Sequence, residues 1–327
     1  MTIRYLDPLE RAWTRARDLL LRPFDLRLWL IIGFTAWLAR LWDGSLSGGD
    51  GGLDLHLDGR DESHGLIRVA VDRLVDVIDN PLSVFVVVVM LLLYLVVGAA
   101  IAWLASRGSF LFLDNVAHRR GRVSEPWDRL GRLGDSLFAW RVATQLLILP
   151  VALLLAAPLL ALVASASHAD GLFRGVGLAL ALPLGALGLL LGLAAAFVGF
   201  CTDQFVVPLM YRHDEGILPA WERFLPLLRR DLPSFLLVAV FYLALAMVVS
   251  AVVAAAGALT CCALFLVLAI PYVGTVVLLP VYVTARAFGP EFLAQFGPEF
   301  ETWPAADPAP DPEPLPEAPE DSDPPQD

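Results

Sequence analysis

Lysine is absent from this sequence of 327 residues, cysteine is scarce and charged residues are few. All 23 basic residues are arginine, a bias that we attribute to genome base composition. The three cysteines, Cys201, Cys261 and Cys262, have neither CxxC spacing nor a neighbouring histidine, which argues against a metal site or a disulfide framework. Charged residues make up only 17% of the chain and apolar residues 57%, so the predicted solvent of this protein is largely lipid.

Catalytic and nucleotide-binding motifs are also missing. The sequence has no GxSxG, HExxH, Walker loop or GxGxxG, and we predict no catalytic residue, no cofactor and no metal. The run from Asp54 to Asp58 alternates acids with His56, but it matches no specific metal motif and we interpret it as a solvated acidic loop. The net charge of −11 comes mainly from that loop and the C-terminal tail, so no nucleic-acid partner is indicated.

Long stretches without charge predict the membrane spans. The stretch from Leu232 to Ala285 has 54 residues, and because a spanning helix needs about 20 it predicts two spans with a turn near Gly257. The first span is the weakest, since Arg27 and Arg40 lie near its ends and must reach the interfaces. The predicted class is an all-α integral membrane protein with six transmembrane helices, at about 24–42, 82–105, 142–165, 176–200, 233–256 and 262–285.

Arginine is distributed unequally between the two sides of these spans. The segments at the chain ends and after every second span hold 18 arginines, and the opposite side holds five. An excess of positive charge marks the cytoplasmic side of a membrane protein. Both termini are therefore predicted to be cytoplasmic.

A Trp-x-Arg sequence occurs three times, each time on the predicted inner side and just before a pair of spans. The residues are Trp13 and Arg15, Trp127 and Arg129, and Trp221 and Arg223. Apolar and charged residues alternate around each copy at helical spacing, which predicts an amphipathic helix in the plane of the headgroups. The chain is thus predicted to be three parallel repeats of an amphipathic interfacial helix plus a membrane hairpin. The helices are interpreted as anchors or as a collar that binds anionic lipid or a membrane protein partner.

The segments that lead into the second and third copies also match each other. Each has an apolar run, a basic patch with His118 or His213, and a glycine, Gly121 or Gly216. Because the pattern is shared, it favours a structural role over a chemical one.

Few features within the spans suggest chemistry. Asp203 follows a long uncharged run and is expected at the inner membrane edge, where it would pair with Arg141 across the bundle. Pro271 and Pro280 predict kinks or a break in the sixth span, a feature of some transporter sites. Small residues of the fourth span favour close helix packing: Ala181, Gly185, Gly188, Gly192 and Ala196.

Two segments are predicted to lie outside the membrane. The outer loop, 43–80, holds nine acids and three arginines, and its part from Gly65 to Asp79 has the spacing of an amphipathic helix. The tail, 303–327, holds eight acids and nine prolines, which predicts disorder and leaves 1–302 as the membrane domain.

Four segments carry a family resemblance: RPFD at 22–25, GFTAWLA at 33–39, FVVPLMY at 205–211 and QFGPEF at 295–300. They resemble an uncharacterised family of bacterial multi-pass membrane proteins, a domain of unknown function. The six-span plan with short amphipathic helices is loosely similar to the membrane domain of some glycerophosphodiester phosphodiesterases. The first resemblance implies the bacterial inner membrane and no assigned reaction. The second covers architecture only and implies no phosphodiesterase activity.

The role predicted from these features is a non-enzymatic scaffold or a lipid-associated accessory protein. The interfacial Trp and Arg residues and the missing catalytic motifs favour this interpretation. A small-solute transporter or channel is the alternative, favoured by the two prolines of the sixth span and the glycines of the fourth. An intramembrane enzyme is the third possibility.

Overall fold

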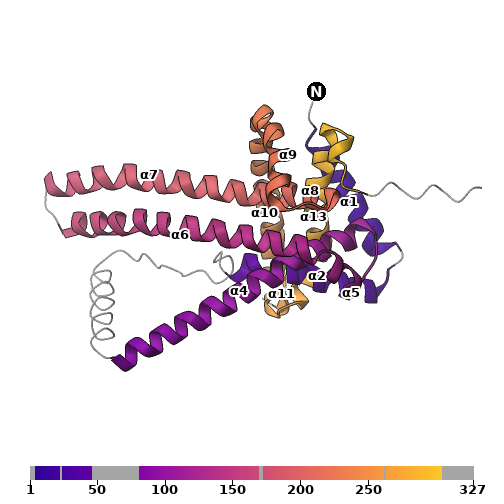
Figure 1. Ribbon diagram of the computed structural model, residues 1–327, viewed down its shortest axis with the longest axis horizontal. Coiled ribbons are helices and arrows are strands. Elements are labelled where there is room, and N and C mark those ends of the chain that lie inside the picture. The colour runs from indigo at the N-terminus through magenta and orange to yellow at the C-terminus, as the bar shows by residue number, and fades with distance from the viewer. Residues whose placement is uncertain (1–3, 23, 46–80, 169–171, 261–262, 304–327) are drawn as a thin grey trace, which may run out of the picture.

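The computed structural model describes residues 4–22, 24–45, 81–168, 172–260 and 263–303 (Figure 1). These residues are helical and contain no strand, in agreement with the predicted all-α class. The predictions for the loop up to residue 80, including its helix at 65–79, and for the tail from 304 lie outside the described residues. The long helices are α1 (Leu6–Leu21), α2 (Leu26–Ser45), α4 (Pro81–Ala117), α6 (Gly131–His168), α7 (Leu172–Cys201), α9 (Ile217–Arg230), α10 (Leu232–Leu259) and α13 (Leu279–Leu293). Shorter elements join them: α5 (Ser124–Arg129), the π-helix η1 (Thr202–Val206), α8 (Val207–His213), α11 (Ala263–Ala269), α12 (Val273–Val277), and the 3₁₀ turns η2 (Ala294–Phe296) and η3 (Pro298–Phe300).

Four helical stretches among these residues are long and apolar enough to cross a membrane. They are Pro81–Ala117, Gly131–Ala156, Gly175–His213 and Leu232–Leu259. Each contains or overlaps one of the six predicted spans. Large apolar side chains are exposed along them, as expected of surfaces that face lipid.

The first and sixth predicted spans have a different form. The first corresponds to α2, a helix of 20 residues whose Arg40 guanidinium stacks 4.0 Å from the ring centroid of Tyr282. The sixth is divided into α11, α12 and α13, and Tyr272, which precedes α12, has a φ of 71°. The interruption lies at Pro271, where the sequence predicts a break, because proline cannot continue the hydrogen bonding of a helix.

The spans leave the rest of the molecule in different directions. Helices α6 and α7 run side by side as one long hairpin, and α4 diverges from them (Figure 1). The opposite ends of these helices meet α1, α8, α9 and α13, where most of the buried apolar side chains gather.

The buried core therefore lies where helix ends meet rather than along the spans. Phenylalanine rings form its centre: Phe205 of η1 lies 5.6 Å from Phe224, 5.2 Å from Phe235 and 5.9 Å from Phe292, measured between ring centroids. Since removing one such side chain from a core costs about 3–5 kcal/mol, this cluster is a major source of stability.

The three Trp-x-Arg segments bury side chains at the same positions. The buried positions are one residue before the tryptophan and three and six residues after it: Ala12, Ala16 and Leu19; Pro126, Leu130 and Leu133; Ala220, Phe224 and Leu227. The spacing is that of one helix face. Each segment thus presents an equivalent face to the core.

The two matching approaches also turn alike. Arg119 has a φ of 50° and Asp214 a φ of 51°, and each lies two residues before the shared glycine. The left-handed conformation stops α4 and α8 and redirects the chain into the next Trp-x-Arg segment. The shared glycines pack beside earlier helices, Gly121 against α2 and Gly216 against α6.

Candidate functional site

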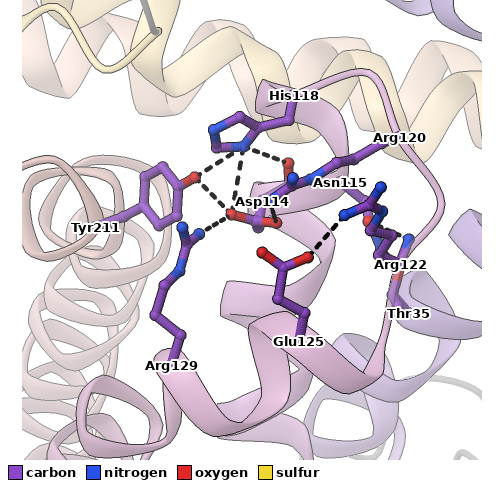
Figure 2. A network of polar contacts seen from close by, with 9 residues as sticks. All are labelled: Thr35, Asp114, Asn115, His118, Arg120, Arg122, Glu125, Arg129 and Tyr211. Atoms are coloured by element: carbon purple, nitrogen blue, oxygen red, sulfur yellow. Dashed lines mark hydrogen bonds and ion pairs between the residues drawn. The ribbon is translucent and has the colours of Figure 1, made fainter.

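A fully buried aspartate near the end of α4 lies at the centre of a polar network (Figure 2). The Asp114 carboxylate accepts hydrogen bonds from Nη2 of Arg129, from the Tyr211 hydroxyl at 2.7 Å and from Nη2 of Arg120 at 3.4 Å. Nδ1 of His118 lies 3.3 Å from the same carboxylate and 3.2 Å from the Tyr211 oxygen. A buried carboxylate is tolerated where charged and hydrogen-bonded partners compensate its desolvation, as they do here.

The fold brings these side chains together from three elements. Asp114 lies in the last turn of α4 and His118 directly after its end, Arg129 ends α5, and Tyr211 comes from α8. The loop between α4 and α5 is held by Asn115, whose Oδ1 accepts the backbone N–H of Arg122 at 3.0 Å. The turn therefore has a defined shape and places its arginines reproducibly.

A second carboxylate, which is exposed, lies beside Arg122 of this turn. Arg122 donates to Oε2 of Glu125 at 2.9 Å. This hydrogen bond, together with the positive charges of Arg120 and Arg129, holds the pKa of Glu125 below its usual range. One surface carboxylate is thus bound by Arg122 and stabilised by the charges of two further arginines.

The other two Trp-x-Arg arginines have carboxylate partners as well. Arg15 Nη2 lies 3.4 Å from Glu291 of α13, and the Arg15 guanidinium also covers the ring of Trp303 at 4.0 Å. Burial lowers the pKa of Arg15, and Glu291 opposes that effect. Arg223 Nε donates to Glu215 at 2.6 Å, and this hydrogen bond raises the pKa of Arg223.

All three predicted collar arginines are therefore bound within the protein. Arg129 contacts an acid of α4, Arg223 an acid just after α8, and Arg15 an acid of α13. Asp114 and Glu215 precede their arginines in the chain, whereas Glu291 follows Arg15 by 276 positions, so the first helix closes on the last. From the sequence these guanidinium groups are expected to face lipid phosphates. In the structure each of them contacts a carboxylate of the protein.

The three collar tryptophans lie at the margin of the core. Trp13 is 49% exposed. Trp127 packs edge-on against Trp103 with centroids 6.1 Å apart, and Trp221 lies 5.9 Å from Trp140. Two of the three are thus half-buried against a second tryptophan of a neighbouring helix.

The structure also brings Arg141 and Asp203 together. Arg141 Nη2 donates to Asp203 Oδ1 at 2.9 Å, and its Nη1 donates to the Ser106 hydroxyl at 3.2 Å. Asp203 lies in the π-helix η1, whose irregular ladder leaves carbonyl groups for other donors. Arg286 uses one of them, donating to the Asp203 carbonyl at 3.1 Å and to the Ser109 carbonyl at 2.9 Å. These two arginines tie α4, α6, η1 and α13 together.

The glycines of α7 lie beside α6 and border an open space. A Cβ added at Gly188 or Gly192 would meet no atom within 4 Å, and one at Gly185 would meet only Leu159. A cavity of about 550 Å³ lies there between α6 and α7, lined mainly by Leu, Ala and Gly. Small residues thus line this space between two helices that lie close to each other.

Sequence reasoning missed Asp114, Tyr211 and Glu291. The sequence offers one signal for the two acids, which is that each is a single acid next to an apolar residue. Leu113 precedes Asp114, and Phe292 follows Glu291. No group of three or more His, Cys, Asp and Glu residues suited to a metal occurs in the part of the chain that the structure describes. The donors around Asp114 occupy its oxygens, so its chemistry is that of a fixed counter-ion for guanidinium groups.

A family model described as "Family of unknown function (DUF7544)" matches residues 4–296 of the chain. No curated protein and no solved structure matches it. The family match confirms the resemblance to an uncharacterised family, and the looser likeness to the membrane domain of glycerophosphodiester phosphodiesterases is not shown.

Proposed function

The chain belongs to DUF7544, a family of unknown function, and we propose its role from its own geometry: an integral inner-membrane protein that acts as a non-enzymatic scaffold or lipid-associated accessory protein. The observation that carries this proposal is the set of three Trp-x-Arg arginines, each bound to a carboxylate from another segment of the chain. Such contacts hold the three Trp-x-Arg segments against the rest of the protein. The polar groups of the core thereby serve to hold the assembly together.

The proposed topology has six spans in three parallel units, with both termini in the cytoplasm. The equivalent buried positions of the three Trp-x-Arg segments support the repeat, and so do the matching turns at Arg119 and Asp214. The contact between Arg15 and Glu291 supports a common side for the first and last helices. In this arrangement α2 and the interrupted segment α11–α13 are the two spans that join the four long apolar helices, which makes six.

Exposed apolar side chains on α1 support the association with lipid. Leu6, Trp13 and Leu21 are exposed on this helix, while Ala12 and Ala16 face the core. A helix that is buried on one side and carries exposed tryptophan and leucine on the other fits the membrane interface. The proposed lipid contact is thus made by α1 and by the surface around the other two Trp-x-Arg segments.

Two experiments test the proposal. Mass spectrometry of the protein ejected from native membranes should show anionic phospholipid retained above its share of the bulk lipid; retention in proportion to bulk composition would contradict lipid association. Reporter fusions after Asp61 should be periplasmic and fusions after Arg120 or Arg229 cytoplasmic, and reversal at any of these sites would break the three-unit topology. Turnover of a lipid or peptide that depends on Asp203 would establish an enzyme instead.

A small-solute transporter is the second candidate, favoured by the interruption between α11 and α12. Broken helices at membrane depth occur where they line a cavity. Here the break coincides with Tyr272 in a left-handed conformation, and its hydroxyl donates to the Leu30 carbonyl of α2 at 2.9 Å. Solute flux in proteoliposomes that is altered by changes at Pro271 or Gly188 would favour this role over a scaffold.

A further inference from the structure

We propose that Arg120, Arg122 and Arg129 bind the phosphate of an anionic lipid headgroup at the position that the Glu125 carboxylate occupies in this structure. The inference rests on the proposed lipid-associated function and names the site and the ligand chemistry. It concerns the outer surface of the Asp114 network, on the loop between α4 and α5 and on α5 itself (Figure 2).

Two of the three guanidinium groups are held in place before any ligand arrives. Arg129 and Arg120 are fixed from behind by the buried Asp114 carboxylate. The backbone of Arg122 is fixed by Asn115. Because the side chains of Arg120 and Arg129 are already ordered in the folded protein, an anion binds them at a smaller entropic cost.

The donors have spare capacity. A guanidinium group carries five N–H bonds, and Asp114 takes Nη2 of Arg120 and Nη2 of Arg129. The side chains of Arg129 and Arg122 are 50% and 62% exposed, so their remaining N–H groups are open to a ligand.

Glu125 shows which kind of ligand fits. Its carboxylate accepts a hydrogen bond from Arg122 and feels the charges of Arg120 and Arg129, which lower its pKa. The Glu125 side chain is itself 53% exposed and can turn away from the arginines. A phosphate has more acceptor oxygens than a carboxylate and pairs with several guanidinium groups at once, so it would replace Glu125.

The neighbouring tryptophans place this surface at the headgroups. Trp127 of α5 packs against Trp103 of α4, and the Arg107 guanidinium lies 4.4 Å from one ring centroid and 5.4 Å from the other. Tryptophan and arginine together are typical of the membrane interface. Glu125 lies two residues before Trp127 in the same short helix, so the ligand we infer is a lipid phosphate and not a soluble one.

Native mass spectrometry of the detergent-solubilised full chain tests the proposal, by titration with phosphatidylglycerol, phosphatidylcholine or inorganic phosphate. The wild type should bind phosphatidylglycerol in preference to phosphatidylcholine. Arg122→Gln should weaken phosphatidylglycerol binding by about three- to tenfold, the range for one exposed charge-assisted contact. Glu125→Gln should strengthen it, because the competing internal carboxylate is lost. Arg132→Gln is the matched control, since Arg132 is exposed and bound to Asp214 away from the cluster.

The outcomes distinguish failure of the proposed phosphate site from failure of the proposed lipid-associated function. If phosphatidylglycerol binds but Arg122→Gln and Glu125→Gln both behave like the control, the site is overturned and the lipid-associated role stands. If the wild type shows no preference for phosphatidylglycerol, both fail. Competition by millimolar inorganic phosphate that displaces the lipid would identify a soluble anion as the ligand and overturn the lipid assignment. Melting curves of the variants check that each is folded, and both substituted side chains are exposed.

Discussion

Replacing Asp114 by asparagine tests whether the buried carboxylate holds the end of α4 to α5 and α8. Removing one partner of a fully buried ion pair costs about 3–5 kcal/mol. Water lowers that figure here, because Arg129 is half exposed and Arg120 about a quarter exposed. Asparagine also keeps an oxygen that can accept the Tyr211 hydroxyl. The expected loss for Asp114→Asn is therefore about 2 kcal/mol in the free energy of unfolding.

Asp135→Asn is the matched control for this change. Asp135 pairs with Arg107 at 2.9 Å, but its side chain is half exposed. A pair of that kind contributes less than about 1 kcal/mol. The measurement is unfolding in mixed micelles by increasing SDS, followed by far-UV circular dichroism, on the same day for wild type and both variants.

A double-mutant cycle identifies the interaction itself. If the loss comes from the contact between the two side chains, Arg129→Gln and Asp114→Asn together should cost less than the sum of the separate changes, by about 1 kcal/mol. Additive effects would show that the two residues do not depend on each other. Equal losses for Asp114→Asn and Asp135→Asn would refute the view that burial makes this carboxylate important.

Three further predictions concern other parts of the molecule. Gly289→Ala should destabilise the protein by more than about 2 kcal/mol, because the added Cβ would lie 2.0 Å from the Gln204 carbonyl oxygen. Gly188→Ala should change the free energy of unfolding by no more than about 0.5 kcal/mol, since no atom lies within 4 Å of the added Cβ. Unfolding by SDS compares the two variants. Glu291→Gln should loosen α1, which limited proteolysis would detect as faster cleavage near the N-terminus; an unchanged rate would show that other contacts hold the helix. The depressed pKa of Glu125 means that its contribution to stability is present above the ordinary pKa of glutamate, about 4.3, and is lost as pH falls through its lower folded value. The stability difference between wild type and Glu125→Gln in detergent without anionic lipid should thus be constant at neutral pH and vanish in acid, and a difference that persists in acid would contradict the assigned cause.

The lipid-facing part of this fold is predictable because it depends on composition alone. A stretch such as 82–105 is apolar in every direction, and a helix of that kind has no stable place in water. The break at Pro271 is predictable for an equally local reason, the missing N–H of proline. The burial of Ala12, Pro126 and Ala220 follows from the Trp-x-Arg register, which is visible as a repeat in the sequence.

The partners of the arginines are not predictable in this way, because they come from distant segments. Arg15 and Glu291 are separated by 276 positions, and Tyr211 and Asp114 by 97. The three acids also lack a common register: Asp114 and Glu291 lie within helices, whereas Glu215 lies in the turn after α8. A pattern search that relies on repeat position finds the three arginines and misses their acids.

The contact between α1 and α13 has a consequence for the order of assembly. Arg129 and Arg223 meet acids that precede them in the chain, so these pairs can form as soon as each Trp-x-Arg helix has been synthesised. Arg15 meets Glu291, which follows the last predicted span, and until then its guanidinium lacks this partner. Glu291 is buried and also lies 3.3 Å from Arg11. When α1 docks against α13, two arginines of α1 therefore pair with this one carboxylate. We therefore expect the docking of α1 against α13 to come late in folding, and a chain cut before Glu291 would lack the carboxylate that Arg11 and Arg15 share.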